Sequence, residues 1–307
     1  MVHTIGIVGA PTSAGAFAAG QEKAPFAMRQ AGFVDLLSGA GADVRDYGDV
    51  PGWRWRPDRT NPRAQNVVHV LETAKAVAER VCEIRAAGRR VIVLGGDCTV
   101  ELGTVSGHCR NHDRVGLIYF DMHADMNIPD GPPPGALDWM GVAHMLGAPG
   151  VVAELSHIGP RYPLVQPEQV LIFAHRSDQA TPWEVEALKR YSLATISLEE
   201  VAAKPELTAA QALRVMAQRC DQILLHFDVD VIDFTDAPLS ENTGRNIGLL
   251  QETALRALGV LFEDARVSAL TITELNPEHS EPDGLTVNTF VKELVSALTG
   301  RRSESNV

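Results

Sequence analysis

The sequence predicts an α/β fold in which helices cover both faces of a mostly parallel central sheet. Short apolar runs alternate along the chain with longer stretches whose apolar residues recur at helical spacing. Such alternation is typical of βαβ units, which build parallel sheets buried on both faces. No internal repeat, low-complexity tract or linker interrupts the pattern. We therefore expect a single domain over residues 1–300 and a flexible C-terminal tail over residues 301–307.

The expected elements follow from the apolar pattern in chain order. Strands are predicted at residues 4–9, 90–96, 114–121, 169–174, 193–198, 222–230 and 267–275. Helices are predicted at residues 64–87, 182–191, 207–220, 248–263 and 285–299, and the segment GGDCTVELG (95–103) leads into another helix. Two long loops, 49–66 and 127–139, are rich in turn-forming residues. Long loops in compact domains tend to be functional, and sites in such folds lie beyond the carboxyl ends of strands.

The composition is that of a globular protein with a net acidic charge. Apolar residues make up 45% and charged residues 21% of the chain, and the formal net charge is −12. Nucleic acids and anionic membranes need a basic face, so neither is expected as a partner. No apolar run reaches the roughly 18 residues that span a bilayer, and the first residues lack the basic segment of a signal peptide. Four cysteines do not suggest a disulfide framework, which indicates reduced thiols in a cytoplasmic protein.

Two of the predicted strand ends carry acidic residues at alternating positions. Residues i, i+2 and i+4 of an extended segment lie on one side, so each strand end can direct its side chains to one point. Buried carboxylates are too costly to gather in this way unless cations neutralise them. Oxygen ligands with an imidazole suit divalent ions such as Mn²⁺, whereas one such motif alone is more often a solvated turn. FDMHADMN (120–127) and HFDVDVID (226–233) supply the candidate ligands Asp121, His123, Asp125, Asp228 and Asp230.

The motifs and their order resemble those of the ureohydrolase family, which includes arginases, agmatinases and formiminoglutamases. The opening residues resemble the family's N-terminal loop and first helix, and the resemblance covers nearly the whole chain. It implies a three-layer α/β/α domain. GGDCTVELG resembles the family motif GGDHS, FDMHADMN resembles DAHAD, FDVDVID resembles SFDVD, and TELNP (273–277) resembles a late E-x-N-P segment.

The resemblance also implies a site with two Mn²⁺ ions bridged by a hydroxide. By position, Asp121 and Asp228 would bridge the ions, and Asp125 would bind one of them and form a hydrogen bond to the hydroxide. His123 and Asp230 would complete the second ion's ligands. Glu274 would contact the guanidinium or amidine group of a substrate through paired hydrogen bonds, and Asn127 matches an asparagine that follows the family's DAHAD motif.

Cys98 is the first departure from the family pattern. It stands at the fourth position of GGDHS, where the family has a histidine ligand. A thiolate is softer than an imidazole and favours Zn²⁺ more than Mn²⁺. Its place at a helix start and beside metals is expected to lower its pKa. Three roles stay open for Cys98: a thiolate ligand, a bystander beside a weakened metal site, or a nucleophile.

The segment PGALDW (134–139) is a second departure. It corresponds to SGNLHG in arginases, so Asp138 stands where a histidine is thought to shuttle protons. Pro134 and Ala136 replace side chains that read the backbone groups of arginine, which removes a reason to expect free arginine as substrate. Asp138 is expected to be either a catalytic acid or base or a helix cap. His144 either replaces the shuttle, if the loop shifts, or is structural.

Two loops bear on substrate choice. SENTGRNIG (240–248) stands where the family tends to have a G-T-x-x-x-G-G segment that shapes the mouth of the site. The loop of Trp53, Arg54, Trp55 and Arg56 either lines the substrate entrance or forms a surface or subunit contact.

Taken with the resemblance, these residues predict a binuclear manganese amidinohydrolase, with Zn²⁺ as an alternative metal. It would cleave a linear C–N bond of a small cationic guanidino or amidine compound, in plain or modified form, and release urea or a urea-like product. The alternative is an inactive arginase-fold protein with a binding or regulatory role, and a thiol-based amidine hydrolase that uses Cys98 is a third reading. The resemblance further implies a homotrimer or homohexamer.

Overall fold

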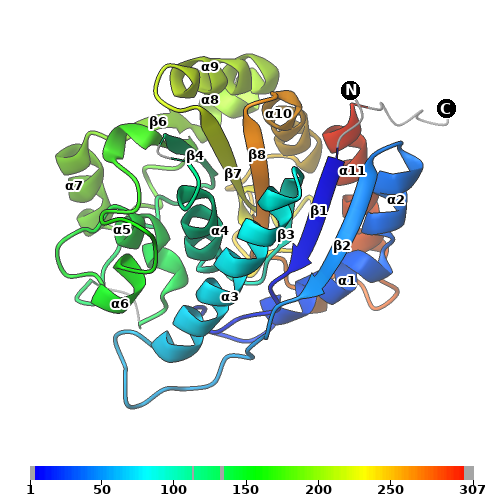
Figure 1. Ribbon diagram of the computed structural model, residues 1–307. Helices are drawn as coiled ribbons and strands as arrows, with labels where there is room; N and C mark the ends of the chain where they lie inside the picture. The colour runs from blue at the N-terminus through cyan, green and yellow to red at the C-terminus, as the bar shows by residue number, and fades with distance from the viewer. Residues whose placement is uncertain (1–3, 113, 132–134, 301–307) are drawn as a thin grey trace.

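The central sheet has eight strands, all parallel, in the order β2-β1-β3-β8-β7-β4-β5-β6 (Figure 1). The computed structural model describes residues 4–112, 114–131 and 135–300, so Pro134 and the predicted tail at 301–307 lie outside the described residues. The strands are β1 Thr4–Gly9, β2 Asp43–Asp49, β3 Arg90–Leu94, β4 Val115–Phe120, β5 Val170–His175, β6 Ala194–Ser197, β7 Gln222–Asp228 and β8 Val267–Thr273.

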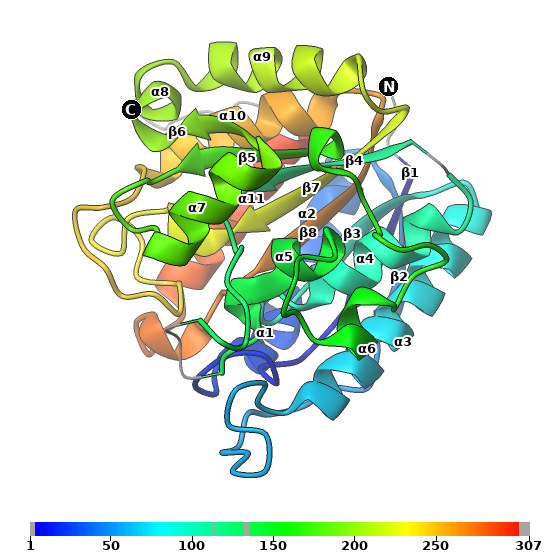
Figure 2. The same ribbon diagram turned by 90° about the vertical axis from the view of Figure 1, so that its left-hand side faces the viewer.

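Helices cover both faces of the sheet (Figures 1 and 2). One core contains buried residues from α1 Ala24–Gln30, α2 Phe33–Gly39, α8 Leu198–Ala203, α9 Pro205–Ala217, α10 Gln251–Glu263 and α11 Leu285–Thr299. The other contains buried residues from α3 Val67–Ala86, α4 Val100–Cys109, α5 Gly141–Met145, α6 Ala153–Ser156 and α7 Pro182–Tyr191. Alternate strand residues face opposite cores: Ile92 and Leu94 pack in the first core, and Val91 and Val93 pack in the second. The predicted α/β architecture, with a sheet between two helical layers, is confirmed.

The structure contains a strand, β2, that the apolar pattern did not predict. Its sequence, DVRDYGD, is mostly charged; five of its seven residues are exposed and the other two are half-buried. It pairs with β1 at the edge of the sheet, where one side of the strand faces solvent. Charged side chains are common on edge strands because they discourage further strand pairing. An edge strand of this kind lacks the apolar alternation that identifies strands in a sequence.

The register of the central strands brings the four sequence motifs together at the carboxyl ends of the strands. Phe120 of β4 pairs with Phe227 of β7, so Asp121 and Asp228 follow on neighbouring strands. Phe227 in turn pairs with Ile272 of β8, which also pairs with Leu94 of β3. The segments that follow β3, β4, β7 and β8 therefore converge. No helix in the described part of the chain is long and apolar enough to cross a membrane.

Candidate metal centre

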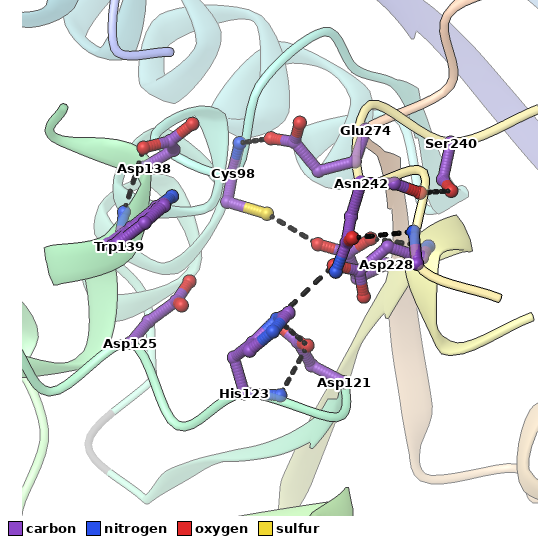
Figure 3. Close-up of polar contacts among 12 residues, drawn as sticks. Cys98, Asp121, His123, Asp125, Asp138, Trp139, Asp228, Ser240, Asn242 and Glu274 are labelled. Atoms are coloured by element: carbon purple, nitrogen blue, oxygen red, sulfur yellow. Dashed lines mark hydrogen bonds and ion pairs between the residues drawn. The ribbon is translucent and has the colours of Figure 1, made fainter. Parts of the chain in front are cut away.

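Two overlapping groups of potential metal ligands lie at the carboxyl ends of the central strands. The outer cluster consists of Asp121, His123 and Asp230. His123 Nδ1 lies 3.2 Å from Asp121 Oδ1 and 3.2 Å from Asp230 Oδ2. The His123 side chain is 30% exposed, whereas both carboxylates are buried. The imidazole therefore forms the solvent-accessible side of this cluster, and Figure 3 shows its contact with Asp121.

The inner cluster consists of Cys98, Asp121, His226 and Asp228, and all four are buried. Cys98 Sγ lies 3.0 Å from Asp228 Oδ2 (Figure 3) and 3.4 Å from His226 Nε2. One potential ligand atom from each of the four residues lies within 4.8 Å of the others. Asp121 belongs to both clusters, so the two groups share a carboxylate.

Local backbone turns explain how these strand ends direct their side chains inward. Asp121 Oδ1 accepts a hydrogen bond from the backbone N–H of His123 at 2.7 Å. Asp228 Oδ1 accepts one from the N–H of Asp230 at 2.7 Å and caps the short 3₁₀ helix Val229–Val231. In each aspartate, one carboxylate oxygen accepts the hydrogen bond that forms the turn. The other oxygen of Asp228 lies 3.0 Å from Cys98 Sγ, and the other oxygen of Asp121 has no hydrogen-bond partner among the described residues. This Asp-x-(His/Asp) arrangement therefore fixes two ligands with a single turn.

The donor atoms fit a divalent cation. Asp121 Oδ2 and Asp230 Oδ1 are buried and have no hydrogen-bond partner among the described residues. A buried carboxylate oxygen without a partner costs free energy that a bound cation would recover. Carboxylates and imidazole suit Mn²⁺, and the thiol of Cys98 adds a softer donor on the inner side. The residues present are therefore compatible with the predicted metal site.

Burial and the neighbouring charges together set the pKa values of the cluster residues. Burial, followed by repulsion from Asp230 and Asp121, raises the pKa of Asp228 well above its usual value. Burial opposes the charged form of His123, but attraction to Asp230 and hydrogen bonding to Asp121 raise its pKa well above the ordinary value. Burial and then the Asp228 carboxylate raise the pKa of the Cys98 thiol. Burial and the acidic side chains thus oppose the lowering of the Cys98 pKa that was expected, and a lowering by bound metal ions stays a prediction.

A cavity of about 390 Å³ opens above the two clusters. Eight of the predicted site residues line it, together with three residues of the segment 240–248 that was expected to shape its mouth and five further residues. The predicted ones are Cys98, His123, Asp125, Asn127, Asp138, Asp228, Asp230 and Glu274, and the others are Phe17, Trp139, Gln179, Thr181, Glu184, Glu241, Asn242 and Thr243.

Asp125 and Glu274 both occupy left-handed backbone conformations. Their φ angles are +48° and +62°, which cost about 1–3 kcal/mol for a residue other than glycine. Asp125 Oδ2 accepts a hydrogen bond from the Tyr119 hydroxyl, and Asp125 lies outside both ligand clusters. Glu274 Oε1 accepts a hydrogen bond from the backbone N–H of Cys98 at 2.8 Å, as Figure 3 shows, and its Oε2 accepts one from Gln21 at 3.1 Å. Glu274 thereby connects the segments after β8 and β3.

Asn127 and Asp138 line the same cavity on the segment after β4. Asn127 Oδ1 accepts a hydrogen bond from the Thr181 hydroxyl at 2.8 Å. Asp138 is buried, and its Oδ1 accepts the backbone N–H of Trp139 at 3.0 Å (Figure 3). Burial and then repulsion from Glu274 raise the pKa of Asp138 well above its usual value. Asp138 begins the 3₁₀ helix Asp138–Met140 but is not its N-cap residue, which is Leu137.

His144 does not reach the cavity. It lies fully buried in α5, its Nδ1 is 2.7 Å from the Met140 carbonyl oxygen, and its Nε2 accepts the backbone N–H of Val152 at 3.1 Å. Burial lowers its pKa to about 4, so the ring is neutral at neutral pH. Both ring nitrogens bond to the backbone and neither faces the cavity, which favours the structural role over the shuttle, the two roles predicted for His144.

The loop of Trp53 and Arg54 packs against the N-terminal segment. The Trp53 ring stacks on His69 with 3.3 Å between ring centroids, and Arg54 forms an ion pair with Glu22. The backbone of Trp53 also exchanges hydrogen bonds with Pro11 and Ser13. Lining the substrate entrance was one of the two roles predicted for this loop. None of the residues 53–56 lines the cavity, so the structure does not support that role.

His226 is the inner-cluster residue that sequence reasoning missed. It precedes FDVD at the end of β7, where the family motif SFDVD has a serine. The same comparison places Cys98 where the family motif GGDHS has its histidine. Comparing these two motif positions together, rather than each by itself, would have revealed that a histidine is lost from one strand end and gained at another.

Comparisons with known proteins agree with this architecture and with these motifs. The profile of the arginase family matches residues 3–299. Human arginase-1 is 30% identical, with 99% of this chain and 95% of that protein covered, and the hepatic arginase of Aquarana catesbeiana is 29% identical over 96% of this chain and 92% of its own. The solved arginase of Bacillus caldovelox superposes with a TM-score of 0.87 at 26% identity, covering 98% of this chain and all of that one. The chain belongs to the arginase family, whose members are hydrolases that act on guanidino C–N bonds.

Proposed function

We propose that the protein is a metal-dependent amidinohydrolase that cleaves a linear C–N bond of a guanidino or modified guanidino compound. The product released would be urea or a urea-like molecule. One observation carries the proposal: members of both ligand clusters and Glu274 line a single cavity. A metal site and a carboxylate that can orient a planar cation are thereby placed around the same reacting position.

The residues of the two clusters and Asp138 have separate roles in this proposal. Asp121 and Asp228 would hold the cations, and His123 and Asp230 would complete the outer position. Bound divalent cations lower the pKa of water and stabilise negative charge on the group under attack. Two Mn²⁺ ions are the proposed occupants, with Zn²⁺ as the alternative at the position nearest Cys98. Asp138, whose raised pKa keeps it protonated to higher pH, would donate a proton to the leaving amine.

The charge of the cavity supports a cationic substrate. Among the described residues that line it there are seven carboxylates and no lysine or arginine: Asp125, Asp138, Glu184, Asp228, Asp230, Glu241 and Glu274. Bound cations neutralise those nearest the clusters, and the others attract guanidinium or amidinium groups. Because Ala136 replaces a polar side chain that arginases use, we propose a modified guanidine, such as a hydroxyguanidine or an acylated one, rather than free arginine.

The proposal is tested by urea release from a panel of guanidino compounds, measured with protein that holds a counted number of metal ions. We expect turnover of at least one modified guanidine and little turnover of arginine. The absence of urea or substituted urea from every compound, with both metals bound, would contradict the proposal. A non-catalytic binding role is the second candidate, favoured by the replacement of the histidine ligand by Cys98. A panel compound that raises the melting temperature without turnover would support that candidate.

We further propose that residues 1–300 act as one domain, that the protein assembles into a homotrimer or homohexamer, and that it works in the cytoplasm. The continuous eight-stranded sheet supports the first point, and the resemblance to arginases supports the second. The cysteines form no disulfide in the described residues, which supports a reducing compartment. Sedimentation of the metal-loaded protein gives the number of subunits, and a monomer would contradict the assembly proposal.

A further inference from the structure

We propose that His226 is a metal ligand of the inner cluster and takes the place of the histidine that is absent at position 98. The inner position would then be held by Cys98, His226, Asp121 and Asp228, a donor set with one thiolate and one imidazole. Such a set favours Zn²⁺, whereas the outer cluster keeps the oxygen-rich set that suits Mn²⁺. The inference rests on the proposed metal dependence, and it adds a ligand and a metal preference that the family motifs do not contain.

The position of the His226 ring is the first argument. Its Nε2 lies 3.4 Å from Cys98 Sγ and 3.2 Å from the Thr273 hydroxyl. Asp228 Oδ2 lies 3.0 Å from the same sulfur atom. The thiol, the imidazole nitrogen and the two carboxylates thus converge on one small volume, and all four residues are at most 2% exposed. The buried Asp121 Oδ2 has no hydrogen-bond partner in the described chain, which independently indicates that a cation belongs there.

The far side of the His226 ring is the second argument. Its Nδ1 lies 3.4 Å from Glu101 Oε2 in α4, and both residues are completely buried. A histidine that binds a metal usually donates its other ring N–H to a carboxylate or carbonyl, which fixes the tautomer and orients the lone pair. The Tyr119 ring, which is parallel to the imidazole within 1° at 4.0 Å, holds its plane. Glu101 and Tyr119 therefore orient the Nε2 lone pair toward Cys98.

A Cys98–His226–Glu101 chain could also serve as a nucleophile with its base. The surroundings of the sulfur favour the metal site instead. Asp228 is nearer to the sulfur than His226 is, and Asp121 lies in the same group. Negative carboxylates at these distances oppose a free thiolate, whereas a divalent cation among them neutralises thiolate and carboxylates together. The experiment with Co²⁺ distinguishes a metal-bound Cys98 from a free, nucleophilic Cys98.

The test uses Co²⁺ as a spectroscopic probe of the full-length, metal-free protein. A thiolate bound to Co²⁺ gives a near-ultraviolet charge-transfer band, and a four-coordinate site gives intense visible bands. We expect wild type to bind two ions and to show both features. His226→Gln is expected to keep the outer ion and to lose at least about 100-fold in inner-site affinity, more than the effect of removing an outer-shell partner. Cys98→Ser should lose the charge-transfer band.

Glu101→Gln is the milder variant, because it keeps the imidazole and changes only its partner. A positioning role predicts a loss of about 10–100-fold in inner-site affinity with the charge-transfer band retained. His108→Gln is the matched control, since His108 is a buried histidine of α4 whose Nδ1 bonds to the Thr104 carbonyl oxygen. It should leave both the affinities and the spectra unchanged. Circular dichroism and melting temperature establish that each variant is folded.

Unchanged cobalt affinity and spectra in a folded His226→Gln protein would overturn the inference, and so would unchanged affinity in Glu101→Gln if His226→Gln does not fold. Loss of activity in His226→Gln with both metals retained would assign the histidine to the nucleophile chain. The result is independent of the proposed function: cobalt binding that depends on His226 without any turnover of guanidines would leave the metal site standing and remove the amidinohydrolase.

Discussion

The outer and inner clusters share Asp121 but differ in burial and in chemistry. The outer cluster combines two carboxylates with a half-exposed imidazole, and its residues match the family motif position by position. The inner cluster is closed from solvent and contains a thiol and a histidine at positions where the family motifs have histidine and serine. Two neighbouring sites in one cavity can therefore be tuned separately. Under the proposed metal dependence, the chain keeps one metal position of its family and has rebuilt the other.

The largest effect is expected from the residue that joins the two clusters. Asp121→Ala removes a carboxylate from both, so we expect fewer than one tightly bound ion per chain. Activity should fall by roughly 10³-fold or more, since metal stabilisation of the transition state contributes several kcal/mol. Elemental analysis and urea release measure the two effects. Retention of one ion at wild-type affinity would show that the clusters do not depend on a shared carboxylate.

The next effect concerns Asp138, a buried acid that lines the cavity. Asp138→Asn should lower kcat by about 100-fold if Asp138 transfers a proton. Because its folded pKa is raised, the group is protonated at low pH and loses its proton as pH rises, so the alkaline fall in kcat should disappear in the variant. If Asp138 only supports the turn at Trp139, the melting temperature falls while kcat and its pH profile are kept. The pH dependence of kcat separates these results.

Glu274 tests whether substrate recognition is separate from both metal positions. Glu274→Gln keeps a side chain of the same size but removes the charge that would face a guanidinium group. We expect KM to rise by about 10-fold to 100-fold, since a hydrogen bond to a charged group contributes about 1.5–3 kcal/mol. Glu241→Gln is the control, because Glu241 lines the cavity and its Oε2 accepts a hydrogen bond from the Asn276 side chain. An equal rise in both variants would mean that the cavity's general charge, and not Glu274, selects the substrate.

Acidification should weaken metal binding at both positions. In the metal-free protein the pKa values of Asp228 and His123 are raised, so these groups hold protons that a cation must displace. Each displaced proton lowers the apparent affinity by about tenfold per pH unit while the group is protonated. The difference in melting temperature between metal-loaded and metal-free protein should therefore shrink from pH 8 to pH 6. A constant difference would show that the ligands carry no protons to displace over that range.

The sequence predicted most of this arrangement because its signals are local. Apolar runs identify the buried strands, and alternating acids at the ends of β4 and β7 identify the outer cluster. Strand β2 was missed because an exposed edge strand has no apolar alternation. His226 was missed because its contact with Cys98 joins residues 128 positions apart and depends on the register of β3, β8 and β7. For His144 the sequence left a shuttle and a structural role open, and the structure favours the structural role, because its ring bonds to the backbone of Met140 before α5 and of Val152 before α6.

The most direct measurement is a competition between metals in the wild type and two variants. Metal-free protein is incubated with equal amounts of Mn²⁺ and Zn²⁺, desalted, and analysed for both elements. We predict one zinc and one manganese per wild-type chain, loss of the zinc alone in His226→Gln, and loss of the manganese alone in His123→Gln. If His226→Gln keeps the wild-type zinc and manganese content, the inner cluster is not a rebuilt metal position, and the contrast between the two clusters has no consequence for metal binding.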